Sequence, residues 1–154
     1  MRQGSFLPWA SSASSAWITE PVEERFRALQ ARQEANHFAN HAHIRLERAD
    51  EEQVVLAMEV QKECTSHLGF VHAGALYTIA ENAAGAAAFH RDGRRYVTQG
   101  GNIHYLGNQT GGTLYAAARV IHGGKSTCLV RTEVTGETGK LLCTAEFSFF
   151  CVDK

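Results

Sequence analysis

Apolar and polar residues alternate along several segments of the chain with the two-residue period of a β-strand. These segments are 42–48, 53–61, 96–106, 113–122, 125–135 and 141–152. The last is the clearest, since every second residue from Leu141 to Cys151 is apolar. Short polar or glycine-containing turns join the last four segments, and consecutive strands joined in this way pair antiparallel. The pattern therefore predicts about six strands in one antiparallel sheet.

Two other segments are predicted to be helical. In residues 21–36, Val22, Phe26 and Leu29 recur on one face, and Pro21 suits a first helical turn. Residues 71–90 are apolar on nearly every side, which is typical of a buried helix, and Gly93 follows as a candidate C-cap. The economical arrangement is an α+β fold in which a curved antiparallel sheet wraps around the helix of residues 71–90.

The chain divides into a short N-terminal tail and one domain. Residues 1–20 contain a short apolar stretch broken by Pro8 and then a Ser/Ala run. We expect this tail to be disordered or to dock through Trp9 or Trp17. Residues 21–154 are long enough for one domain with a modest core.

Composition narrows the classes of partner. The net charge of -1 and pI near 6.7 argue against nucleic acid or an anionic membrane as partner. No apolar run approaches the roughly 20 residues of a membrane span. None of the four cysteines forms a C-x-x-C pair, which fits a reducing cytoplasm. The eight histidines form neither H-E-x-x-H nor a Cys/His cluster, so no metal site is predicted.

Glu81 is the residue that fits its surroundings least. It lies in the middle of the apolar helix, between Ala80 and Asn82. A buried carboxylate must be paired, hydrogen-bonded or protonated, because otherwise it costs several kcal/mol. Glu81 is therefore a candidate catalytic group, unless it lies on a solvent-facing strip of the helix or bonds a neighbouring backbone group.

The segment that leads into this helix, residues 66–74, mixes glycine, histidine and small residues. The free N–H groups at a helix N-terminus form an anion site that could hold the oxyanion developing on a carbonyl. An ordinary loop and cap would have the same sequence features, so this segment alone does not decide between the two.

Residues 69–76 (GFVHAGAL) together with Glu81 resemble the G-x-x-H-G-G motif and acidic residue of hot-dog-fold thioesterases, most closely the phenylacetate-pathway type. Residues 98–106 resemble the third strand of that family. The resemblance implies an acyl-CoA thioesterase without a separate cofactor, since coenzyme A is part of the substrate. It assigns Glu81 as base or nucleophile, the Ala73 amide as carbonyl donor, Thr98 as the group that positions water, and His72 a structural role at the helix start.

The chain departs from the family pattern at two places. Ser66 and His67 stand where the family usually carries Asn or Gln, and Ala73 replaces the first glycine of the pair. These changes put the supporting contact to the substrate carbonyl in doubt. The residues expected to contact substrate are Ser66, His67, Gly69, Gly74, Asn82, Arg94 and Lys125, the last two through the phosphates of coenzyme A.

The spacing of Ala73 and Glu81 adds a prediction about assembly. Eight helical residues span about 12 Å, so one thioester cannot reach both groups of one chain. Antiparallel helices in a twofold dimer could bring Ala73 of one protomer to Glu81 of the other. The resemblance also implies a homodimer with shared active sites, and the sequence leaves a tetramer open.

Two other functions remain open from the sequence. A hot-dog dehydratase or hydratase acting on 3-hydroxyacyl or enoyl thioesters would use His67 and Glu81, which are fourteen residues apart. A non-catalytic acyl-CoA-binding protein would carry Glu81 pointing away from the ligand.

Overall fold

The computed structural model describes residues 20–153, so the predicted tail of residues 1–20 lies almost wholly outside the described residues. The helices are α2 (Val22–Glu34), α3 (His37–His41), the short 3-10 helix η2 (Lys62–Cys64) and α4 (Ala73–Asp92). The strands are β1 (Ile44–Ala49), β2 (Val54–Glu59), β3 (Tyr96–Tyr105), β4 (Thr113–Gly123), β5 (Thr127–Thr135) and β6 (Leu141–Cys151).

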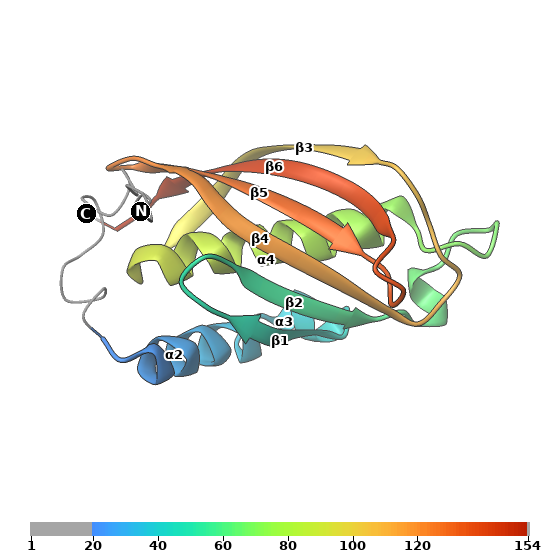
Figure 1. Cartoon of the computed structure of the whole chain (residues 1–154), viewed down its shortest axis with the longest axis horizontal. Helices are drawn as coiled ribbons and strands as arrows, with labels where there is room; N and C mark the ends of the chain where they lie inside the picture. Colours follow the sequence, from blue (N-terminus) through green and yellow to red (C-terminus); the bar gives the residue numbers. More distant parts are fainter. Residues whose placement is uncertain (1–19, 154) are drawn as a thin grey trace, which may run out of the picture.

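Within the described residues, the strands form one six-stranded sheet in the order β1-β2-β4-β5-β6-β3, with every pair antiparallel. Figure 1 shows this sheet curving over α4, with α2 and α3 on the side of β1 and β2. The predicted α+β arrangement, a curved antiparallel sheet around one long helix, is therefore confirmed. Strand β3 occupies one edge of the sheet, and most of its residues are exposed.

Helix α4 packs against the sheet because its small residues allow a close approach. Its alanines from Ala80 to Ala88 are almost completely buried against apolar side chains such as Leu114, Val130 and Phe147. The helix ends at Gly93, whose φ of 71° is left-handed and suits glycine. No helix in residues 20–153 combines the length and apolar character needed to cross a membrane.

The predicted helix of residues 21–36 corresponds to α2, and a short second helix, α3, follows it that the sequence did not predict. Helix α2 ends at Glu34, and Asn36 then caps α3 by accepting a hydrogen bond from the Ala39 N–H at 3.1 Å. Asparagine competes with the helical backbone for hydrogen bonds in this way, which is why it favours caps. Because α3 occupies residues 37–41, strand β1 begins at Ile44, after His43 with a left-handed φ of 55°.

Candidate active site

The start of α4 presents a backbone amide that has no acceptor. His72 is the N-cap, and its Nδ1 accepts a hydrogen bond from the Gly74 N–H at 2.8 Å. A Cβ on Gly74 would lie 3.0 Å from that Nδ1, so the second motif glycine leaves room for the cap. Among the described residues nothing accepts a hydrogen bond from the Ala73 N–H, although Tyr105 donates to the Ala73 carbonyl at 3.1 Å. His72 thus caps α4 through its side chain, and the role of the Ala73 amide as carbonyl donor stays a prediction.

The turn before α4 is held by its own backbone. The Ser66 N–H donates to the Phe70 carbonyl at 2.7 Å, and the Ser66 Oγ accepts from the Leu68 N–H at 3.3 Å. Gly69 has a φ of 78°, which favours glycine at this position. The His67 side chain is exposed and forms no hydrogen bond with any described residue, Glu81 included. Substrate contacts for Ser66, His67 and Gly69 stay predictions.

Glu81 on α4 and Thr98 on β3 lie side by side in the structure. The Thr98 hydroxyl donates a hydrogen bond of 2.5 Å to the Glu81 Oε1. Glu81 is only partly buried and Thr98 is exposed, so the pair lies near the surface of the protein. The Glu81 carboxylate is therefore only partly buried, and its hydrogen bond with Thr98 of β3 orients it at the surface of α4.

Asn82, the next residue, is engaged inside the protein. Its Oδ1 accepts from Asn36 at 3.0 Å, and its Nδ2 donates to the Thr78 carbonyl at 2.9 Å. Both polar atoms of the Asn82 amide thus have partners, and the side chain is 8% exposed. The amide connects the cap of α3 to α4, while its predicted substrate contact is untested.

The two cations expected to meet the phosphates lie beyond the C-terminal end of α4. Arg94 forms an ion pair with Asp92 at 2.7 Å and donates to the Lys125 carbonyl at 2.8 Å. These bonds place Arg94 and Lys125 side by side, at the turn between β4 and β5. The Arg94 charge already has a partner, so a role in holding phosphate stays a prediction.

A pocket of about 350 Å³ lies beside the first two turns of α4. Its walls come from α3 and the two residues after it, the end of β2, the segment around η2 and the first two turns of α4. The side chains that line it include Phe38, His41, His43, Met58, His72 and Thr78. Ala75 and Thr78 line the pocket and lie between Ala73 and Glu81 in the sequence, so the pocket adjoins the predicted site.

Arg32 on α2 is a residue near the site that the sequence did not reveal. Burial lowers the pKa of its guanidinium, and the charge of Glu81 raises it. The pattern of apolar and polar residues in α2 does not indicate that Arg32 lies near Glu81, because the position of Arg32 depends on how α2 packs across α4.

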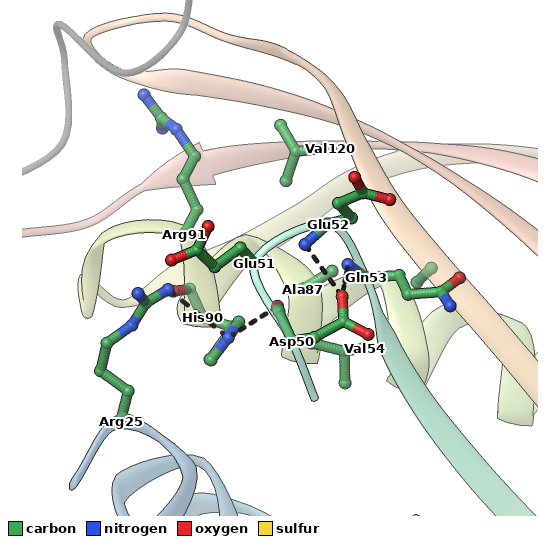
Figure 2. A pocket seen from close by; sticks show the side chains of 11 residues that line it. Arg25, Asp50, Glu51, Glu52, Gln53, Val54, Ala87, His90, Arg91 and Val120 are labelled. Carbon is green, nitrogen blue, oxygen red and sulfur yellow. Dashed lines mark hydrogen bonds between the residues drawn. The ribbon is translucent and has the colours of Figure 1, made fainter. Parts of the chain in front are cut away.

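A second pocket, of about 40 Å³, lies at the other end of α4. Figure 2 shows His90 of α4 between Arg25 of α2 and Asp50 of the turn after β1. The His90 Nε2 lies 3.2 Å from the Asp50 carbonyl, and Arg25 donates to the His90 carbonyl at 3.3 Å. Burial and the positive charge of Arg25 lower the pKa of His90 to about 4. The contacts around this pocket connect α2 to α4 and have a structural role.

The His90 environment predicts a loss of stability in mild acid. The unfolded chain binds a proton at His90 near the ordinary pKa of 6.5, whereas the folded chain binds it only near 4. Stability from this group is therefore complete above about pH 6.5 and falls as the pH drops toward 4, by about 3 kcal/mol in total. Urea unfolding at pH 7.5, 5.5 and 4.5 should show a smaller pH dependence in His90→Gln than in the unmodified protein. Exposed His104→Gln is the control and should keep the full dependence; equal slopes in all three proteins would refute the assignment.

Comparison with known proteins decides the family. A model of the thioesterase superfamily matches residues 68–143, a range that contains the motif, Glu81 and Thr98. A 1,4-dihydroxy-2-naphthoyl-CoA hydrolase of Listeria monocytogenes is 33% identical over 93 residues, covering 59% of this chain and 76% of that protein. This chain belongs to the thioesterase superfamily. The enzyme is thus a hydrolase that acts on thioester bonds.

Solved structures of superfamily members share the hot-dog fold seen here. The thioesterase PA1618 of Pseudomonas aeruginosa superposes with a TM-score of 0.75 at 28% identity, covering 87% of this chain and 95% of that one. The PaaI protein of the E. coli phenylacetic acid degradation operon superposes with a TM-score of 0.79 at 23% identity, covering 85% and 95%. The expected resemblance to hot-dog thioesterases is confirmed.

Proposed function

We propose that this thioesterase hydrolyses a small-molecule acyl-CoA, with Glu81 as general base or nucleophile. The observation that carries the proposal is the hydrogen bond from Thr98 to the carboxylate of Glu81, a residue that is only partly buried. A carboxylate held in this way can take a proton from water or attack a carbonyl carbon directly. The name of the Listeria relative, a hydrolase of an acyl-CoA, supports the choice of substrate.

The Ala73 amide is the proposed donor to the thioester oxygen. It lies at the N-terminus of a 20-residue helix and has no acceptor among the described residues. Such an amide is oriented before substrate binds, and the helix dipole favours negative charge beside it. As the thioester carbon becomes tetrahedral, the Ala73 N–H would stabilise the charge that develops on the oxygen.

We propose that the active site is shared across a homodimer. Ala73 and Glu81 are both on α4, about 12 Å apart along the axis at 1.5 Å per residue. Strand β3 is an exposed sheet edge whose unpaired backbone groups suit pairing with a second copy, and Val97 and Tyr105 on it are 49% and 46% exposed. Pairing of two such edges would place the α4 helices antiparallel, with Ala73 of each near Glu81 of the other. Whether dimers pair further into a tetramer is a separate question for solution measurements.

Ala73→Pro tests this function by replacing the amide hydrogen of the proposed donor with a ring carbon of proline. Proline is tolerated at the first helical position, and His72, with φ of -64° and ψ of 139°, has the conformation favoured before proline. We expect the variant to fold normally and to lose about 100-fold or more in kcat for thiol release from acyl-CoA. Ala73→Gly keeps the N–H and is the control. Full activity in Ala73→Pro would exclude the amide from the reaction.

A further inference from the structure

Arg32 lies along the same side of α4 as Glu81. Its guanidinium carbon is 5.7 Å from the centroid of the Phe89 ring, and its Nη2 is 3.3 Å from where a Cβ of Gly85 would be. Gly85 and Phe89 follow Glu81 by four and eight residues, so the three share one face of the helix. Glycine at position 85 leaves the space that the guanidinium occupies.

The guanidinium has no polar partner among the described residues. Its Nη1 is buried, and within residues 20–153 nothing forms a hydrogen bond with it and no carboxylate lies within ion-pair distance. Glu81 is close enough to influence Arg32 electrostatically, but the contact that holds its carboxylate is Thr98. Arginine keeps its charge in proteins, and a buried charge normally has a partner. The missing element is therefore an acceptor beside Gly85.

We propose that Arg32 is an anion-binding subsite for the far end of the acyl group, and that the enzyme prefers acyl groups ending in a carboxylate. This inference rests on the proposed function, because it takes the thioester carbon to lie at Glu81. Gly85 is one turn further along α4, about 6 Å away. A chain of four or five carbons attached to the thioester carbon spans that distance and brings a terminal carboxylate to the guanidinium. The carboxylate would supply the charge-assisted hydrogen bonds that Arg32 lacks.

Two pairs of substrates with equal chain length test the proposal: glutaryl-CoA against valeryl-CoA, and adipyl-CoA against hexanoyl-CoA. Thiol release is measured for the unmodified enzyme and for Arg32→Met and Arg32→Lys, with thermal midpoints recorded for each. We expect the unmodified enzyme to favour the carboxylated member of each pair. Arg32→Met should lower kcat/KM for that member about tenfold, mainly through KM, and leave its uncharged partner within about twofold.

Two further variants sharpen the result. Arg32→Lys keeps a positive charge but lacks the planar guanidinium, so it should retain part of the preference for carboxylated acyl groups. Gly85→Ala should displace the guanidinium slightly and weaken the carboxylated substrates alone.

Each alternative outcome has a distinct meaning. Equal losses on both members of a pair would show that Arg32 acts through the fold or through Glu81, and would overturn the subsite. A preference of the unmodified enzyme for uncharged acyl groups would overturn it even if Arg32→Met failed to fold. Hydrolysis of none of the acyl-CoA esters would instead refute the proposed function on which the subsite rests.

Discussion

Glu81→Gln should lower kcat/KM for acyl-CoA hydrolysis at least about 100-fold, since a positioned acid or base typically contributes a factor of 10² to 10⁴. Glutamine has nearly the same shape, and its amide oxygen can still accept the hydrogen bond from Thr98 that now holds the carboxylate. The substitution therefore removes the charge and the basicity while keeping the local packing. Steady-state thiol release, with the thermal midpoint measured on the same sample, gives both quantities.

The matched control is Glu51→Gln, at an exposed glutamate in the turn between β1 and β2. It makes the same chemical change away from Thr98 and should leave kcat/KM within about twofold, as surface substitutions usually do. If Glu81→Gln retained more than a tenth of the activity, another group would have to activate water. The Glu81 carboxylate, which Thr98 holds by a hydrogen bond, would then have only a structural role.

Gly101→Ala should be the most damaging single-methyl change in the strand that carries Thr98. A Cβ at this position would lie 2.5 Å from the Phe147 Cε1 and 2.8 Å from the Tyr77 hydroxyl. Phe147 is completely buried and packs edge-on against Tyr77, with ring centroids 5.4 Å apart, so it cannot move aside cheaply. We expect a loss of about 2–3 kcal/mol of stability and a thermal midpoint lower by about 5–10 °C. Activity should fall as well, because β3 would be pushed away from α4.

Gly100→Ala, one residue earlier, is the control. Its Cβ would meet only the Ser148 Oγ, at the ordinary contact distance of 3.7 Å. Any general effect of alanine on β3 is common to both variants, so their difference isolates the clash with Phe147. Equal thermal midpoints for the two variants would contradict the close packing of Gly101 against Phe147 of β6 and Tyr77 of α4.

Much of the fold follows from periodicity. Strands β5 and β6 alternate cleanly, and α4 is apolar on nearly all sides, so both types of element could be placed to within a few residues. The short helix α3 was missed because it depends on one side chain, Asn36, which caps it by competing with the backbone. Hydrophobic spacing does not record such a competition. The sheet order also required the structure, since β1 and β2 could have joined either edge.

The candidate site could be predicted from the sequence only in part. Glu81, His72 and Ala73 are close in sequence on one helix, so their relation could be inferred from a motif. The proximity of Thr98 to Glu81 came from family resemblance and is a contact between distant segments. The sequence did not indicate Arg32 as a site residue, because its position depends on how α2 packs over Gly85 and Phe89. The contacts of Asn82 with Asn36 and of Arg94 with the Lys125 carbonyl likewise join distant segments, and the sequence did not indicate them.

Complementation between two different variant chains in one dimer tests most directly whether the active site is built from two protomers. Ala73→Pro and Glu81→Gln chains carrying different affinity tags are co-expressed, and the mixed dimer is purified through both tags. If each site combines Ala73 of one protomer with Glu81 of the other, one of the two sites is intact, and kcat should return to about half of the unmodified value. A purified mixed dimer as inactive as either parent would contradict a site built from two protomers.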